Sequence, residues 1–156
     1  MERIISETEK LLSDKTHGTV NDRALLLNNK AMLPSNRNDK LAKSISLMNK
    51  ALSMCDEKSN PVLFANINMN LGLLYTENKK AERGLEFMDK AYLFIKLTRA
   101  YNNDFITITR NYAATLSENG RVIKAIEVLK ECEFATKGCC SNNHAALLYD
   151  LGAAYI

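Results

Sequence analysis

Apolar side chains recur every three or four positions along most of the chain, which is the spacing of amphipathic helices. The positions between them are polar, and Asn, Pro and Gly mark the boundaries: Asn60 with Pro61 starts a helix, and Asn119 with Gly120 makes a turn. The pattern predicts an all-α chain with helices at residues 2–14, 20–33, 40–56, 61–77, 81–98, 103–118, 121–136 and 143–156.

The predicted helices repeat in pairs with a period of 41 residues. Residues Asn70, Gly72, Gly84 and Met88 return one period later as Asn111, Ala113, Ala125 and Leu129. The period defines pairs at 20–56, 61–98 and 103–136, followed by the first helix of a fourth unit at 143–156. We interpret residues 1–156 as one domain, with 2–14 as an N-terminal cap or the second helix of an earlier unit. The last helix ends inside an apolar run, which suggests a truncated or final repeat.

A motif of small and large residues accompanies the period: Leu71, Gly72, Tyr75, Gly84, Met88 and Ala91, with its first half repeated at Leu151, Gly152 and Tyr155. In these residues the chain resembles the tetratricopeptide repeat (TPR) family, in the long-repeat form of about 40 residues found in kinesin light chains, polarity scaffolds and bacterial peptide sensors. The resemblance covers residues 20–156, although Lys30 and Pro34 depart from the motif. It implies a right-handed superhelical solenoid of antiparallel helix hairpins, whose first helices line a concave groove.

One polar position recurs on the predicted first helices, occupied by Asn29, Asn70, Asn111 and, in the fourth unit, Asp150. A side-chain amide both donates and accepts hydrogen bonds, so a row of them can hold an extended peptide backbone. The alternatives are a solvated helix face or an amide that bonds the neighbouring helix. Including neighbouring positions, the predicted peptide-binding groove comprises Asn29, Asn66, Met69, Asn70, Leu73, Arg110, Asn111, Tyr149 and Asp150.

Met69 and Leu73 either accept an apolar side chain of the peptide or pack against the next helix. Arg110 is the one basic residue among the groove positions. The resembling co-chaperones clamp a terminal carboxylate with several lysines and arginines at such positions. The sequence therefore argues against a carboxylate-clamp ligand.

Composition narrows the functional classes. The net charge of +3 is spread among alternating acidic and basic residues, so no basic stripe predicts nucleic-acid binding through this domain. No run of apolar residues is long enough to span a membrane. The start at Met1 carries no apolar signal core, which favours a cytoplasmic location with four reduced cysteines.

Candidate chemistry is sparse. Cys132, Cys139, Cys140 and His144 bring four possible zinc ligands close in sequence, but Cys132 falls at a buried position of the repeat and adjacent cysteines suit zinc poorly. His17 and His144 lie in no catalytic motif. We therefore predict no catalytic residue, no metal site and no cofactor.

The leading hypothesis is a scaffold module that binds an extended peptide or a helix of a partner protein in the concave groove. The alternative is the ligand-sensing portion of a bacterial peptide-responsive transcriptional regulator. A third hypothesis is self-association through the C-terminal helix. None of the three is catalytic.

Overall fold

The computed structural model describes residues 19–32, 38–137 and 142–154, and within these ranges it contains seven helices and no strand. The predicted helix at 2–14 lies outside the described residues. The helices are α2 (Val20–Ala31), α3 (Asn38–Met54), α4 (Pro61–Glu77), α5 (Ala81–Leu97), α6 (Asn103–Glu118), α7 (Val122–Ala135) and α8 (Asn142–Ala153).

The helix starts follow from local capping. Thr19 forms a capping box with Asp22, in which the Asp22 backbone N–H donates to Thr19 Oγ1 at 3.2 Å and the Thr19 N–H donates back to the carboxylate. Asn60 accepts a hydrogen bond from the Leu63 N–H at 3.1 Å, ahead of Pro61 at the first helical position. These side chains satisfy backbone donors that have no partner inside the helix.

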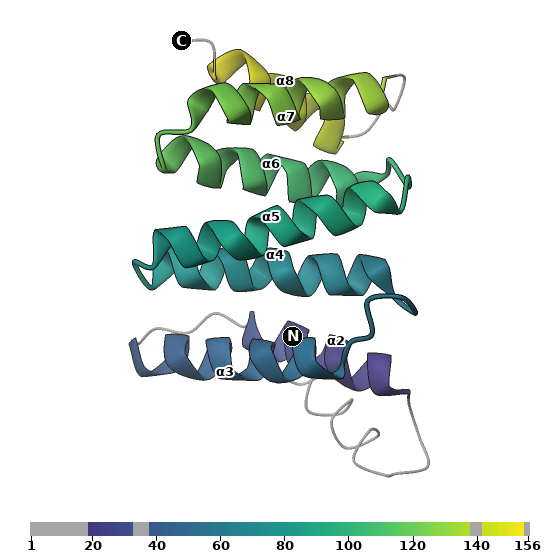
Figure 1. Cartoon of the computed structure of the whole chain (residues 1–156), viewed down its shortest axis with the longest axis vertical. Coiled ribbons are helices and arrows are strands. Elements are labelled where there is room, and N and C mark those ends of the chain that lie inside the picture. The colour runs from purple at the N-terminus through teal and green to yellow at the C-terminus, as the bar shows by residue number, and fades with distance from the viewer. Residues whose placement is uncertain (1–18, 33–37, 138–141, 155–156) are drawn as a thin grey trace.

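The helices stack antiparallel in chain order along the long axis of the molecule, from α2 and α3 at one end to α7 and α8 at the other (Figure 1). The backbones of the first helices approach one another, α2 with α4, α4 with α6 and α6 with α8. In the described part of the chain the second helices α3, α5 and α7 make no such mutual approach. The first helices therefore form the more closely spaced, inner side. The predicted solenoid of helix hairpins is confirmed.

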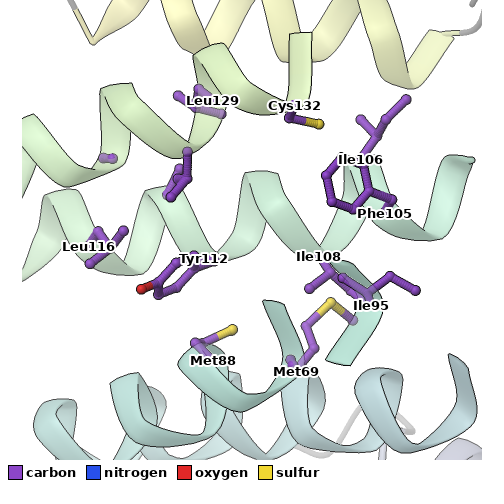
Figure 2. Packing of buried hydrophobic residues seen from close by; sticks show 14 of the residues in the cluster. Met69, Met88, Ile95, Phe105, Ile106, Ile108, Tyr112, Leu116, Leu129 and Cys132 are labelled. Carbon is purple, nitrogen blue, oxygen red and sulfur yellow. The ribbon is translucent and has the colours of Figure 1, made fainter. Parts of the chain in front are cut away.

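Two core clusters share helix α4. Leu63, Ile67 and Leu71 face the N-terminal cluster with α2 and α3, while Ala65 and Met69 belong to the larger cluster that continues through α8. Figure 2 shows the centre of the larger cluster, where Met69, Met88, Ile95, Phe105, Ile106, Ile108, Tyr112, Leu116, Leu129 and Cys132 meet. Each helix pair is thus joined to the next by shared apolar contacts, as expected for a repeat protein.

The turns inside the second and third units have the same left-handed backbone but different residues. Gly120 has φ +72°, and Lys79, one period earlier, has φ +57°. A glycine adopts this conformation without strain, whereas a residue with a Cβ is disfavoured there by about 1–2 kcal/mol. The sequence predicted the Asn119-Gly120 turn but not its equivalent at Asn78-Lys79.

Replacing Lys79 with glycine should therefore stabilise the chain by about 1 kcal/mol, because it removes this strain. Chemical unfolding followed by circular dichroism measures the change in the free energy of unfolding. Replacing Gly120 with lysine is the matched control and should destabilise the chain by a similar amount. Equal stability of all three chains would show that the left-handed turns carry no strain.

Candidate functional site

The recurring polar position of the first helices makes contacts between neighbouring helices. In each case the residue reaches back to the position just before its equivalent on the preceding first helix. The three contacts are Asn70 Nδ2 to Asn28 Oδ1 at 2.9 Å, Asn111 Nδ2 to Met69 Sδ at 3.3 Å, and Arg110 Nε to Asp150 Oδ2 at 2.5 Å. The row thus joins α2 to α4, α4 to α6 and α6 to α8.

The residues of this row differ in their burial and in how many of their hydrogen-bonding atoms are already used. Asn70 is only 9% exposed and its amide is bonded to Asn28, so its donor serves the packing of α2 on α4. Asn29 is exposed on α2 and accepts a hydrogen bond from Asn28. Asn111 is half-buried and donates to the Thr107 carbonyl at 3.1 Å. Among the described residues its Oδ1 atom accepts no hydrogen bond, so Asn111 keeps an available acceptor.

A cavity of about 570 Å³ opens between α6 and α8, over the start of α7. It brings together three of the predicted groove residues, Arg110, Asn111 and Asp150. The full lining consists of Thr107, Arg110, Asn111, Ala113, Ala114, Ser117, Val122, Leu129, Asp150, Ala153 and Ala154. Most of these side chains are small or apolar, and the polar ones lie on α6 and at Asp150 of α8.

The size of the residues at equivalent positions explains why the cavity lies here. Ala114 stands one period after Leu73, which is partly buried and packs against the larger core cluster. The shorter Ala114 instead lines the open cavity between α6 and α8. This signal was present in the sequence, because the period pairs the two residues, but the predicted groove did not include the lining residues Ala113, Val122, Leu129, Ala153 and Ala154.

The polar edge of the cavity carries an ion pair whose two charges sum to zero. The Arg110 guanidinium donates to the Asp150 carboxylate, and both side chains are only partly exposed. A pair of this kind contributes about 0–1 kcal/mol to stability. Because the two charges compensate, the edge offers hydrogen-bonding groups without a net charge that would select a charged ligand.

The other predicted groove residues do not line the cavity. Met69 is buried, and Asn66 and Leu73 are half-buried on α4. Tyr149 on α8 is 77% exposed. Of the predicted groove residues, the structure therefore brings Arg110, Asn111 and Asp150 together around one cavity. Asn29 lies on the first described helix and Tyr149 on the last, outside this cavity.

The cysteine and histidine cluster is only partly described. Cys132 is fully buried between α6 and α7, as predicted, and burial raises the pKa of its thiol to about 11, so it is a neutral core side chain. Cys139 and Cys140 lie outside the described residues. His144 Nδ1 lies 3.2 Å from Thr136 Oγ1. Within the described ranges, no three side chains of the kinds that bind metals come together.

No helix of the described ranges combines the length and the apolar character that crossing a bilayer demands.

Comparisons with known proteins identify the fold. No family model matches the chain, and no curated protein matches it. Among solved structures it is similar to a candidate kinesin light chain of Podosopora anserina with nearly identical TPR-like repeats. A point variant of that protein has 16% identity and a TM-score of 0.63, over 98% of this chain and 85% of the other. The second structure has 15% identity and a TM-score of 0.61, over the same shares of both chains.

At this level of identity the likeness establishes the fold, and the chain is a TPR-like helical repeat. The resemblance predicted from Leu71, Gly72, Tyr75 and their repeats is confirmed at that level. The comparisons lend no support to the alternative of a bacterial transcriptional regulator.

Proposed function

We propose that this TPR-like solenoid is a protein-interaction module that binds an extended segment of a partner protein along its first helices, with an apolar side chain of that segment in the cavity between α6 and α8. The cavity is the observation that supports the proposal most. Its walls are small and apolar, and its edge carries hydrogen-bonding groups. That combination is typical of sites that bury a ligand side chain and orient the adjoining polar atoms.

The anchor side chain is expected to be aliphatic or aromatic and uncharged. Burying a side chain of the size of leucine contributes about 1.5–3 kcal/mol, whereas a charge would lose its hydration with no unpaired opposite charge to meet. Arg110 and Asp150 already neutralise each other. Selection therefore depends on the shape and the apolar area of the anchor.

The backbone beside the anchor is expected to bond Asn111. Its Oδ1 atom faces no donor among the described residues and can accept a peptide N–H. Asn70 contributes less to binding, because its amide already bonds Asn28. The proposed binding site therefore centres on Arg110, Asn111, Ala114 and Asp150, with the remaining predicted groove residues beside it.

The proposal makes the chain a binding module and assigns it no catalysis. A cytoplasmic location remains our proposal, and Cys55 and Cys132 are free thiols in the structure, as is usual in that compartment. Helical repeats of this kind bind through an extended surface, and such a surface suits a peptide ligand.

Replacing Ala114 with leucine tests the proposal directly, because Ala114 lines the cavity and leucine is the residue at the equivalent position one period earlier, Leu73. Peptides are first selected from a random linear library on the unmodified chain. Their affinity for the variant should fall about tenfold or more, since loss of the buried anchor removes at least ~1.4 kcal/mol. Fluorescence anisotropy with a labelled peptide measures the change.

Ala42 provides the matched control, because it is exposed on α3, far along the stack from the cavity. Ala42→Leu should leave peptide affinity unchanged, and the helicity of both variants should equal that of the parent chain. If selected peptides bind the Ala114→Leu variant as tightly as the parent, the anchor does not occupy this cavity and the proposal is wrong.

A further inference from the structure

A row of apolar side chains crosses the first helices on the inner side of the stack. Met32, Leu73 and Ala114 stand one repeat period apart, at the C-terminal cap of α2 and on α4 and α6. Met32 and Ala114 are exposed, and Leu73 is half-buried. Both α4 and α6 have a first helix on either side, so this surface lies within the stack and not at its end. We call these three residues the apolar row.

Two carboxylates lie beside the apolar row. Glu77 and Glu118 each stand four residues after a member of the row, which places them one turn further along the same side of α4 and α6. Both are exposed, and neither pairs with a basic residue in the described part of the chain. Lys79 and Lys80 belong to the turn that leads to α5, and Arg121 is paired with a glutamate of α5. This edge of the inner side therefore carries negative charge that a basic ligand would complement.

The distance between neighbouring first helices sets the spacing of contacts with a ligand. The side chains of Asn28 and Asn70 join α2 to α4 at 2.9 Å. The side chains of Met69 and Asn111 join α4 to α6 at 3.3 Å. Helices packed in this way lie about 8–10 Å apart, and an extended chain that crosses them advances about 3.1–3.4 Å per residue. About three ligand residues therefore span the distance from one member of the apolar row to the next.

A spacing of three residues distinguishes between the two extended conformations of a peptide. In a β-strand successive side chains alternate between two faces, so a residue three positions further on points away from the surface. A polyproline II helix has about three residues per turn and rises about 3.1 Å per residue, so every third side chain lies on the same face, about 9.3 Å apart. This repeat matches the spacing of the apolar row. Because a polyproline II helix has no internal hydrogen bonds, its backbone N–H groups are also available to Asn111 Oδ1.

We propose that the ligand is a polyproline II segment with an apolar residue at every third position and a basic residue between successive apolar ones. Its apolar side chains contact Met32, Leu73 and Ala114 in turn, and the largest of them enters the cavity beside Ala114. Its basic side chains meet the exposed carboxylates of Glu77 and Glu118. The inference rests on the proposed function, because it concerns the peptide bound in the same groove. It adds the conformation, the sequence period and the charge of that peptide.

A synthetic peptide of four Leu-Lys-Pro triplets tests the period, with fluorescence anisotropy as the measurement. Its proline residues favour the polyproline II conformation both at their own positions and at the preceding lysine residues. The comparison peptide has the same composition, but its leucines stand alternately two and four residues apart. The triplet peptide should bind at least about tenfold more tightly, because the comparison peptide cannot place successive leucines on neighbouring first helices. Equal affinities of the two peptides would overturn the inference.

The charge is tested with a chain that carries both Glu77→Gln and Glu118→Gln. Its affinity for the triplet peptide should fall about fivefold at low salt, because two exposed ion pairs are lost. The matched control carries Glu86→Gln and Glu127→Gln, which remove exposed carboxylates from α5 and α7, and it should bind like the parent chain. Unchanged affinity of the first variant, or an equal loss in the control, would overturn the inference. The proposed function would still stand if library-selected peptides lose affinity on Ala114→Leu, so the two failures are distinguishable.

Discussion

Replacing Gly84 with alanine is expected to destabilise the chain by about 2–3 kcal/mol, although alanine is the better helix former. A Cβ at Gly84 would lie 2.3 Å from Thr76 Oγ1 and 2.8 Å from the Gly72 carbonyl oxygen. Both atoms are held in place, because Thr76 Oγ1 donates to that carbonyl at 3.0 Å. The added methyl group must separate α4 from α5 or break this hydrogen bond, and either change outweighs the gain in helix propensity of about 1 kcal/mol.

Gly152→Ala, at another glycine of the same repeat motif, is expected to raise the stability of the chain. A Cβ there meets nothing within 4 Å, so the substitution should stabilise α8 by about 0.5–1 kcal/mol. Urea unfolding at low protein concentration measures both variants without interference from association. If both substitutions shift the free energy of unfolding in the same direction, the close approach of Gly72 and Gly84 does not constrain the fold.

The repeat period predicted the architecture because it reports a physical requirement. Paired helices must approach at Gly72 and Gly84, and the same requirement returns at Ala113 and Ala125. The observed ends of α4 and α6 equal the predicted ones, and α5 ends one residue earlier than predicted. Deviations of two residues occur at both ends of α3. Helix ends are decided by local capping, which periodicity does not encode.

The hydrogen-bond partners of the recurring polar residues on the first helices could not be predicted from the sequence. The period showed that Asn29, Asn70 and Asn111 are equivalent, but not that Asn70 bonds Asn28 instead of Asn29. That choice depends on a stagger of one residue between neighbouring first helices, which only three-dimensional packing fixes. Our groove prediction treated the whole row alike, whereas the structure separates a packed Asn70 from a more available Asn111.

The position of the cavity can be predicted from the sequence only when equivalent residues of neighbouring repeat units are compared. A single alanine at Ala114 predicts nothing, because alanine is common in helices. Paired with Leu73 through the period, it marks the place where side-chain volume is missing. The volume itself also depends on how α8 lies against α6, through the Arg110 and Asp150 pair, and this contact could not be derived from the pattern.

The largest loss of stability is expected for Phe105→Ala, at about 3–5 kcal/mol. Phe105 is 1% exposed in the first turns of α6, where its ring centroid lies 6.4 Å from that of Tyr92 on α5 and 5.0 Å from that of Tyr101 (Figure 2 shows its place in the core). Removing the ring leaves a cavity at the joint between the second and third units and ends both aromatic contacts. A domain of this size has a total stability of only about 5–15 kcal/mol, so the loss is a large fraction of it.

Because each unit of a solenoid contacts only its neighbours, the damage should also reduce cooperativity. We expect the helices α6, α7 and α8 to unfold at lower urea concentration than α4 and α5, which broadens the transition measured by circular dichroism. Amide hydrogen exchange should then show faster opening in α6–α8 than in α4. Tyr101→Ala is the control, since Tyr101 is 43% exposed at the edge of the same aromatic cluster and should lose much less stability. Equal losses for the two variants would mean that the units are joined elsewhere, through contacts such as Met69 with Asn111 and the stacking of Tyr92 on Tyr112.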